Sequence, residues 1–415
     1  MKRVLVWGLG KSGQAAVKLL ESKGVTVFCG DDARGDRWEE LIGEVDTLVL
    51  SPGIPPRHPL WREAIRKGIE VIGELELAYR FFEGEVIAIT GTDGKSTTTT
   101  LTYLMLSRRF PQVYEAGNIG TPLSEIALRN PSATAVVEVS SFQGKTLTTF
   151  KPKVGAFLNF YEDHLDWHPS LEDYLKSKQN IFLRQSHEDF FIAGSAQEEV
   201  TGTPTYAKKI LLEKNVQLAK GVAYFEGEKL FELSDLNLKG EHNFRNALVA
   251  SIIALLKGVG VDSIRDTLRE FKGLPFRMEF VGKWTGVEIY NDSKSTTPNA
   301  LRAALESFPD DSVILIAGGK DKGADFEPLR ELVQRKVKFA FLIGETKELM
   351  KAAFGGGSCI TLMNSLEDAV NKALEVAKPG DFILFSPGCS SFDMFTSYIE
   401  RGEVFNRLVR ERCKL

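Results

Sequence analysis

Short apolar runs rich in β-branched residues alternate with segments of helical periodicity along the whole chain of 415 residues. The runs predict strands at 4–7, 25–29, 47–51, 86–90, 135–139, 154–159, 313–317, 339–343 and 382–386. Helical spacing of apolar residues predicts helices between them, for example at 12–23, which Gly24 ends, and at 97–106. Alternating strands and helices are typical of βα units, so we expect an α/β protein with parallel sheets.

Two turn-prone segments interrupt this pattern and predict domain boundaries. The first follows Phe82, where Gly84 separates a helix from a strand, and the second contains Gly273 and Pro275 after a long helical region. We therefore expect three domains, at 1–84, 85–273 and 274–415.

The composition is that of a globular protein, with 43% hydrophobic and 26% charged residues. The formal net charge of −4 provides no overall basic field, so we expect neither nucleic acid nor an anionic membrane as a partner. No apolar stretch approaches the roughly 18 residues of a membrane-spanning helix. The four cysteines, Cys29, Cys359, Cys389 and Cys413, are far apart in sequence, which fits the reducing cytoplasm.

The first glycine-rich segment, Gly8-Leu9-Gly10-Lys11-Ser12-Gly13, joins a strand to a helix. Such glycines let the backbone approach a pyrophosphate, and Asp31 and Asp32 follow about 20 residues later, as in dinucleotide sites. A tight turn without a ligand has the same pattern. The predicted domain is about half of a dinucleotide fold, so a mononucleotide or a nucleotide-sugar diphosphate fits better than NAD. Ser51 and Gly53 leave the third strand toward the same crevice.

The second segment, Gly91-Thr92-Asp93-Gly94-Lys95-Ser96-Thr97, also lies between a predicted strand and a helix. Backbone N–H groups of such a loop surround phosphates, its lysine contacts their outer oxygens, and its hydroxyls help to hold Mg²⁺. Ile89 replaces the leading glycine of the full motif. The order of strand, loop and helix still favours a nucleoside triphosphate site over a structural turn.

A third segment, 316–323, contains Gly318, Gly319, Lys320 and Lys322 after a strand. A glycine turn with two solvated lysines and a binding loop explain it equally well. By itself this segment assigns no ligand.

Acidic and imidazole groups collect at the ends of the central strands. Glu138 lies near the end of one strand, where a P-loop protein needs a second metal ligand. Glu162, Asp163, His164 and Asp166 follow the next strand and are expected at the same edge. Histidine is an unusual Mg²⁺ ligand and a single one is more often structural, so both roles stay open for His164.

The helix that follows contains a lysine on its apolar face. Ser170 with Asp173 resembles a capping box at its start, and Lys178 lies on the face formed by apolar residues. Those residues are Leu171, Tyr174, Leu175, Ile181 and Phe182. A buried ammonium group needs an anion, a metal-site role or chemical modification, unless its long stem carries it out to solvent.

Together these segments resemble the Mur ligases of bacterial peptidoglycan synthesis, over essentially the whole chain. The stretches that carry the resemblance are 8–13, 51–54, 91–97, 117–120, 138–143, 162–166, Tyr174 with Lys178, His242-Asn243 with Asn246, Phe276-Arg277, 291–294 with Thr296, and 386–395. The resemblance implies an N-terminal Rossmann-like domain that binds a UDP substrate and a central P-loop ATPase domain with a mostly parallel sheet. It also implies a C-terminal Rossmann-like domain that binds an amino acid.

Within the family, segments 138–143 and 386–393 are similar to those of the members that add D-glutamate to UDP-N-acetylmuramoyl-L-alanine. The D-N-P-R motif of the members that add diaminopimelate or lysine is absent from the sequence. Asp93, Phe392 and Tyr398 depart from the pattern, which has asparagine, leucine and phenylalanine there. The activity that the resemblance implies is an ATP-dependent ligation through an acyl phosphate.

The resemblance also implies residue roles, which are predictions. Catalysis is expected of Lys95, Glu138, His164 and Lys178. Mg²⁺ is expected at Ser96, Thr97, Glu138, His164 and Lys178, with Lys178 N-carboxylated. ATP contacts are expected from Gly91, Thr92, Asp93, Gly94, Lys95, Ser96, Thr97, Asn243, Asn246, Arg277, Asp292 and Lys294. Substrate contacts are expected from Gly8, Gly10, Lys11, Ser12, Asp32, Arg34, Ser51, Gly53, Asn118, Gln143, Thr296, Lys322, Ser391, Phe392 and Tyr398. Of these, Lys322, Thr296 and Ser391 are expected to hold the D-glutamate carboxylates.

We expect a cytoplasmic monomer whose ligands are UDP-N-acetylmuramoyl-L-alanine, D-glutamate, ATP and Mg²⁺. Three alternatives stay open: another Mur ligase step or a relaxed amino-acid specificity, an NAD-dependent oxidoreductase, and a non-catalytic nucleotide-binding regulator. The oxidoreductase leaves the P-loop and Lys178 unexplained. The regulator needs none of Glu138, His164 and Lys178.

Overall fold

The computed structural model describes residues 1–165, 167–238 and 240–414. The chain divides into two compact units, one of Met1–Leu236 with Arg245–Glu270 and one of Asn237–Phe244 with Phe271–Leu415. Both contain parallel sheets flanked by helices, which confirms the predicted α/β class. The domain limits at 84 and 273 stay a prediction.

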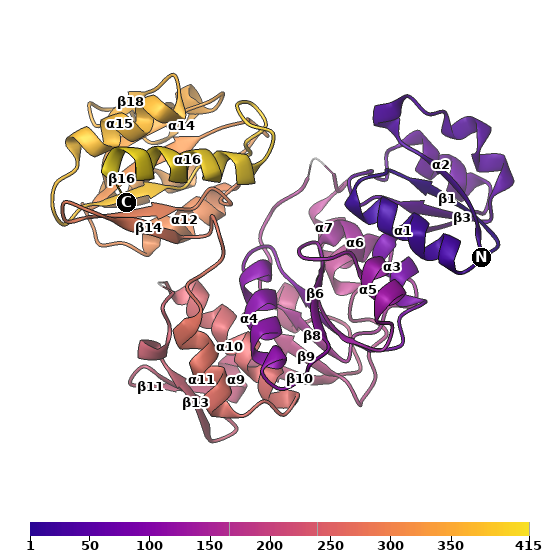
Figure 1. Ribbon diagram of the computed structural model, residues 1–415. Coiled ribbons are helices and arrows are strands. Elements are labelled where there is room, and N and C mark those ends of the chain that lie inside the picture. Colours follow the sequence, from indigo (N-terminus) through magenta and orange to yellow (C-terminus); the bar gives the residue numbers. More distant parts are fainter. Residues whose placement is uncertain (166, 239, 415) are drawn as a thin grey trace. The chain divides into compact units, whose positions relative to one another are not determined.

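The first unit begins with a four-stranded parallel sheet in the order β2-β1-β3-β4, drawn in indigo in Figure 1. Its strands are β1 (Arg3–Trp7), β2 (Thr26–Gly30), β3 (Thr47–Leu50) and β4 (Glu70–Gly73). Its helices are α1 (Lys11–Ser22), α2 (Pro59–Arg66) and α3 (Glu74–Tyr79). The inner strands β1 and β3 are buried almost throughout, because helices cover both faces of a parallel sheet.

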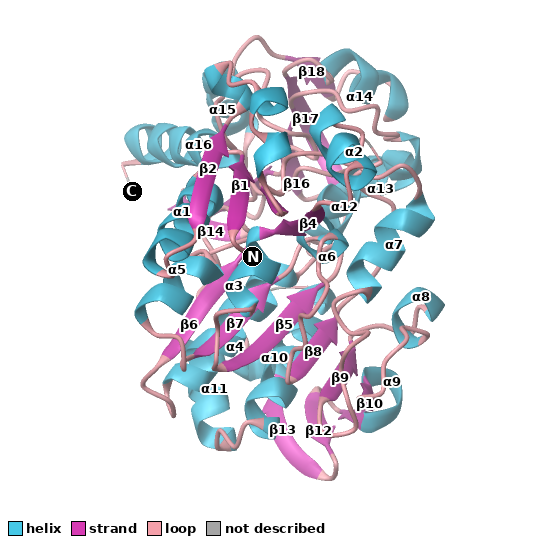
Figure 2. Ribbon diagram, turned by 90° about the vertical axis from the view of Figure 1, so that its right-hand side faces the viewer, coloured by secondary structure: helices cyan, strands magenta, loops and turns pink. Residues whose placement is uncertain are grey.

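The same unit contains a six-stranded parallel sheet in the order β10-β9-β8-β5-β7-β6, whose strands lie side by side in Figure 2. The strands are β5 (Glu85–Thr90), β6 (Val113–Gly117), β7 (Thr134–Glu138), β8 (Val154–Phe157), β9 (Phe190–Ala193) and β10 (Lys208–Leu211). The helices are α4 (Lys95–Ser107), α5 (Leu123–Arg129), α6 (Ser141–Lys145), α7 (Leu171–Gln179), α8 (Glu198–Thr201), α9 (Leu212–Asn215), α10 (Glu241–Leu256, from Arg245 on in this unit) and α11 (Val261–Glu270). A small antiparallel sheet consists of β11 (Val216–Ala219), β12 (Val222–Phe225) and β13 (Glu228–Glu232).

The second unit has a six-stranded sheet in the order β14-β15-β19-β16-β17-β18, in which β14 alone runs antiparallel to its neighbour. The strands are β14 (Glu279–Trp284), β15 (Val287–Asn291), β16 (Val313–Gly318), β17 (Val337–Ile343), β18 (Ile360–Leu362) and β19 (Phe382–Phe385). The helices are α12 (Pro298–Glu306), α13 (Arg330–Lys336), α14 (Lys347–Ala353), α15 (Leu366–Val376) and α16 (Tyr398–Cys413). None of the helices in the described residues has the length and apolar character needed to cross a membrane.

Every strand predicted from the apolar runs is present, with ends that differ by at most about two residues. The pattern missed β4, β6, β10, β14 and β18, which lie at sheet edges and contain polar residues. It also missed the interior strands β9 and β15 and the small antiparallel sheet.

The predicted helix that carries Lys178 differs from expectation in three respects. It ends at Gln179, so Ile181 and Phe182 follow the helix, although both are buried. Leu171 is 41% exposed and does not belong to the apolar face. Ser170 Oγ accepts the N–H of Asp173, but the Asp173 carboxylate bonds to Lys145 and His168, so the reciprocal half of the capping box is missing.

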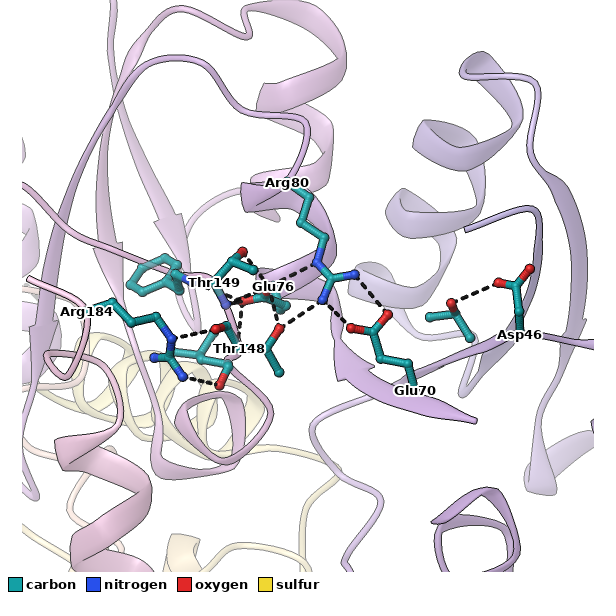
Figure 3. A network of polar contacts seen from close by, with 10 residues as sticks. Asp46, Glu70, Glu76, Arg80, Thr148, Thr149 and Arg184 are labelled. Carbon is teal, nitrogen blue, oxygen red and sulfur yellow. Dashed lines mark hydrogen bonds and ion pairs between the residues drawn. The ribbon is translucent and has the colours of Figure 1, made fainter. Parts of the chain in front are cut away.

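A buried carboxylate ties α3 to the segment that follows α6 (Figure 3). Glu76 is fully buried and accepts hydrogen bonds from the N–H groups and hydroxyls of Thr148 and Thr149, and from the N–H of Phe150. Arg80 adds a bond to Glu76 at 3.0 Å and reaches Glu70 at 2.6 Å. Burial raises the pKa of Glu76, but the bonds from Thr149 and Thr148 outweigh it and lower the pKa to about 2.

Candidate active site

The loop between β5 and α4 has the tight geometry of a phosphate-binding loop. Gly94 adopts a φ of +81°, and a Cβ there would lie 2.3 Å from Oδ1 of Asn246, so the loop packs closely against α10. Asn159 Oδ1 accepts the N–H groups of Thr92 and Asp93 at 3.1 and 2.9 Å. Lys95 Nζ donates to the carbonyl oxygens of Gly91 and Thr92, and Ser96 and Thr97 are buried in the first turn of α4.

Glu138 ends β7, the strand beside β5, and its carboxylate is only half satisfied. Oε1 accepts the Asn118 amide at 2.7 Å, whereas Oε2 is buried without a hydrogen-bond partner among the residues that the structure describes. A buried carboxylate oxygen with no donor is costly, and a divalent cation would satisfy it. No three His, Cys, Asp or Glu side chains in the described ranges form a ready metal cluster. Mg²⁺ usually takes one or two carboxylates and completes its shell with water and phosphate, so Glu138 fits it.

Lys178 confirms the prediction of a lysine directed inward. Its side chain is 1% exposed, Nζ donates to the Gly91 carbonyl oxygen at 2.6 Å, and the ammonium lies 4.7 Å from the ring centroid of Tyr174. Burial and then the charge of Lys95 hold the pKa of Lys178 well below its usual value, against the opposing influence of Asp163 and other carboxylates. Protonation of this amine is therefore less favourable than that of an exposed lysine.

His164 lies in the loop after β8, the other neighbour of β5. Its φ is +56°, and its Nε2 lies 3.4 Å from Oδ2 of Asp163. Its ring centroid is 4.7 Å from that of Phe142 and 6.1 Å from that of Tyr174. The predicted gathering of Asp163 and His164 at the edge that carries Glu138 is thus observed, while Asp166 lies outside the described residues.

The glycine loop after β1 is in contact with two other segments of the chain, those of Ser51 and Asp31. A Cβ on Gly8 would lie 2.5 Å from the Ser51 Cβ, which confirms that these two segments face each other. Asp31 Oδ2 accepts the Leu9 N–H at 2.6 Å, and the bonds from Leu9 and Ala33 lower the pKa of Asp31. Asp31 therefore caps the loop, a role that the comparison with dinucleotide sites did not predict.

The other residues predicted to contact a substrate in this unit are mostly accessible. Those that are exposed are Gly10, Lys11, Asp32, Arg34 and Gly53, and Ser12 is partly exposed. Lys11 Nζ donates to the Gly120 carbonyl oxygen at 2.7 Å. Gln143 is the exception: it is buried, and its side chain forms the capping box of α6 with Ser140.

Most of the predicted residues of the second unit lie on loops at the carboxyl ends of the adjacent strands β15, β19 and β16, whereas Asn243 lies in α10, Arg277 precedes β14 and Tyr398 begins α16. Asp292 follows β15 and accepts the Met278 N–H at 3.1 Å and the Ser386 hydroxyl at 2.8 Å. The Lys294 ammonium lies 3.8 Å from the ring centroid of Tyr398. Lys322 follows β16 and is exposed. The remaining predicted residues here are Asn243 and Ser391, which are buried, Arg277 and Thr296, which are partly buried, and Phe392, which is 68% exposed.

Arg401 in α16, which no sequence pattern indicated, organises two of these loops. Its side chain is 1% exposed and donates to the carbonyl oxygens of Ser293, Cys389 and Ser390 and to the Ser293 hydroxyl. Burial lowers the pKa of Arg401 to about 10. No local pattern distinguishes this arginine from the other charged residues of its helix.

Comparison with known proteins identifies the family. Residues 89–254 match the Mur ligase middle domain, and residues 276–389 match the Mur ligase glutamate ligase domain. The chain belongs to the Mur ligase family. This Mur ligase is an ATP-dependent enzyme, so the oxidoreductase and the non-catalytic regulator are no longer alternatives.

Two relatives match almost the whole of this Mur ligase. It is 57% identical over 408 residues to the UDP-N-acetylmuramoylalanine--D-glutamate ligase of Aquifex aeolicus (strain VF5), covering 98% of each chain. It is 51% identical over 412 residues to the enzyme of the same name from Hydrogenobaculum sp. (strain Y04AAS1), again with 98% of each covered.

Solved structures share the fold at lower identity. A pseudomurein peptide ligase type C from Methanothermus fervidus has a TM-score of 0.64 at 19% identity, with 99% of this chain and 100% of that chain covered. The UDP-N-acetylmuramate-alanine ligase MurC from Thermotoga maritima has a TM-score of 0.62 at 16% identity, with the same coverage. At these identities the likeness concerns the fold alone.

Proposed function

We propose that this Mur ligase joins D-glutamate to UDP-N-acetylmuramoyl-L-alanine at the expense of ATP, in peptidoglycan precursor synthesis. The observation that carries the proposal is the identity of 57% and 51% to two D-glutamate ligases, each over 98% of this chain. The P-loop after β5, with Glu138 and Lys178 beside it, is the part of the structure suited to the ATP chemistry.

The reaction has two steps. A carboxylate oxygen of the L-alanyl group attacks the γ-phosphorus of ATP, the bond to ADP breaks, and an acyl phosphate forms. The amino group of D-glutamate then attacks the acyl carbon, phosphate leaves with the bonding electron pair, and the nitrogen loses a proton. Both steps develop negative charge, so the site must supply positive charge and hydrogen-bond donors.

We assign the phosphates of ATP to the amides of the P-loop and to Lys95. We assign Mg²⁺ to Glu138 with Ser96 or Thr97, and a second ion to His164 and Lys178; bound Mg²⁺ would neutralise the charge that develops on phosphate. The unpartnered Glu138 Oε2 supports the first assignment. Asn118, which contacts Glu138, and His164 are assigned to the incoming carboxylate.

We also propose that Lys178 is N-carboxylated in the active enzyme. Burial lowers the pKa of Lys178 and so raises the share of neutral amine. The neutral amine attacks CO₂, a nitrogen–carbon bond forms, and a proton leaves to solvent. The carbamate carries one negative charge and two oxygens, which suits a hard divalent cation better than an ammonium group does. Lys178 would then contribute an anionic ligand next to the P-loop.

The remaining assignments follow the loops on which the residues lie. Asn246, beside Gly94, is assigned to ATP, and Asn243, Arg277, Asp292 and Lys294 are assigned to ATP from the second unit. The loops after β1, β2 and β3 are assigned to the UDP group. Lys322, Thr296 and Ser391, with Phe392 and Tyr398 near them in sequence, are assigned to D-glutamate.

We propose that the enzyme acts as a monomer in the cytoplasm and binds no nucleic acid. All four cysteines lie in the described part of the chain and none is disulfide-bonded, which is consistent with a reducing compartment.

The function is tested by incubating the purified protein with ATP, Mg²⁺, UDP-N-acetylmuramoyl-L-alanine and one amino acid at a time. D-Glutamate, L-glutamate, L-lysine and meso-diaminopimelate are compared, and phosphate release and product mass are followed. The expected result is an amide product whose formation with D-glutamate has a much higher kcat/KM than with any of the other three amino acids. A higher kcat/KM with another amino acid, or no product with any of them, would overturn the proposal.

A further inference from the structure

His168 is a buried residue at the centre of a polar array between α6 and α7, whose outer members Asp173 and Lys145 are partly exposed. Its imidazole is fully enclosed: Nδ1 lies 2.8 Å from Oδ2 of Asp173, and Nε2 lies 2.9 Å from Oγ of Ser141. Lys145 donates to the other carboxylate oxygen of Asp173. The ring also stacks on Phe142, with centroids 5.7 Å apart and an interplanar angle of 27°.

The order Ser141–His168–Asp173 is that of a hydrolytic triad, but the surroundings point to a fixed array. The Ser141 residue is 2% exposed and its hydroxyl lies in the first turn of a short helix, so no substrate carbon can approach it. The carboxylate of Asp173 fixes the proton on Nδ1, which leaves Nε2 to accept the Ser141 hydroxyl. Both ring nitrogens are thereby used to hold the imidazole in one orientation.

The same residue ends the turn that holds His164. The N–H groups of Trp167 and His168 both donate to the His164 carbonyl oxygen, at 3.0 and 2.9 Å. His164 has a φ of +56°, a left-handed conformation that is strained for a residue with a side chain and persists only where the surroundings enforce it. Phe142 contacts both imidazoles, since its ring centroid is 4.7 Å from that of His164.

We propose that His168 is a positioning residue: anchored by Asp173 and Ser141, it holds the turn that keeps His164 in its left-handed conformation. This inference rests on the proposed function for the role of His164 in catalysis. No step of the reaction occurs on His168. Without its anchor, the turn would relax and the His164 imidazole would leave its position beside Phe142 and Tyr174.

The test is a double-mutant cycle with a spectroscopic readout. The variants are His168→Phe, which keeps an aromatic ring but loses both polar contacts, His164→Ala, and the two combined. Ser141→Ala removes only the partner of Nε2 and serves if His168→Phe does not fold. His187→Phe is the matched control, because His187 is an exposed histidine whose ring contacts Tyr206.

Loss of position at a reacting centre lowers kcat steeply, and His168→Phe is expected to lower it about tenfold or more, with Ser141→Ala less affected. In the His164→Ala background the same change is expected to alter kcat less than about threefold, because the residue on which it acts is gone. The inference would be overturned if the double variant lost kcat by the product of the two single-variant factors. It would also be overturned if His168→Phe had an effect no larger than that of His187→Phe.

A second readout does not depend on activity. The chain has five histidines, so selective ¹³C labelling resolves the His164 Cα signal by NMR. In His168→Phe this signal is expected to leave the range of left-handed residues, whereas His187→Phe leaves it in place. An unchanged signal in a folded His168→Phe variant contradicts the inference. Absence of ligase activity in the wild type would instead count against the proposed function, and the NMR result would still decide the anchoring role.

Discussion

Lys178 Nζ and the Gly91 carbonyl oxygen are 2.6 Å apart, although 87 residues separate them in sequence. The bond places α7 against the first residue of the P-loop. Because the same amine is buried and close to Lys95, protonation is disfavoured at the point where the loop must meet phosphate.

Lys178→Ala is expected to be nearly inactive, because it removes the group that we propose to carry the anionic carbamate. Acetate should restore part of the activity by occupying the vacated position, and ¹³CO₂ should give a carbamate signal in the wild type alone. Phosphate release and ¹³C NMR measure the two effects. Lys176→Ala is the matched control on α7, since Lys176 is solvent-exposed and paired with Glu172. Near-normal activity of Lys178→Ala without a response to acetate would remove the carbamate from the mechanism.

Lys95→Met is expected to abolish phosphate release while the folded state remains. The reason is that the ammonium compensates phosphate charge, whereas its hydrogen bonds within the described ranges go to the backbone carbonyl oxygens of Gly91 and Thr92. ATP binding by calorimetry and phosphate release are measured together with thermal unfolding. Lys18→Met, on the exposed side of α1, should behave as the wild type. Wild-type turnover at unchanged ATP affinity would show that Lys95 has another role.

Lys322→Ala is expected to raise KM for D-glutamate with a much smaller effect on KM for the UDP substrate. A hydrogen bond to a charged group contributes about 1.5–3 kcal/mol, which sets the expected loss of binding. Steady-state kinetics with each substrate varied in turn give the comparison. Lys320→Ala is the control from the same loop, because the Lys320 ammonium is paired with Glu345 at 2.7 Å. An increase confined to the UDP substrate would mean that the amino-acid pocket lies elsewhere.

Glu76→Gln is expected to lower the free energy of unfolding at pH 7 and to flatten its dependence on acid pH. Burial opposes ionisation of Glu76, but hydrogen bonds from Thr149 and Thr148 outweigh it and lower its pKa from 4.5 to about 2 in the folded state. The resulting stabilisation, on the order of 3 kcal/mol, is fully present above pH 4.5 and is lost as the pH falls toward 2.

Urea unfolding at several pH values between 7 and 3 checks this prediction. The slope of stability against pH below 4.5 should be smaller in Glu76→Gln than in the wild type. Glu39→Gln, at an exposed position, should preserve the wild-type slope. Equal slopes for Glu76→Gln and the wild type would show that Glu76 does not titrate in this range.

The hydrophobic pattern predicts buried interior strands better than edge strands. The strands β1, β3, β5, β7 and β16 are buried almost throughout, and their continuous apolar runs made them recognisable. Edge strands such as β6 and β14 contain polar residues because one margin lacks a neighbouring strand, so their pattern resembles that of a loop.

The P-loop, Glu138 and the loop of His164 could be expected at one edge from sequence alone. Each follows a strand, and parallel strands place their carboxyl ends together. The order of the strands in the sheet, β8-β5-β7, was not available from the sequence, and it is what makes these three loops direct neighbours.

The α/β class could be predicted from the alternation of strands and helices along the chain, and the P-loop and the place of Lys178 on an apolar helix face from spacing within one short segment each. Four roles became visible only in the folded chain: Asn159 supports the P-loop, Asp31 accepts a hydrogen bond from the glycine loop, and His168 and Arg401 are buried anchors. These contacts join residues that are far apart in the chain and chemically ordinary in their own segments. Their significance comes from burial, where an unpaired polar group is costly and every partner must be supplied by folding.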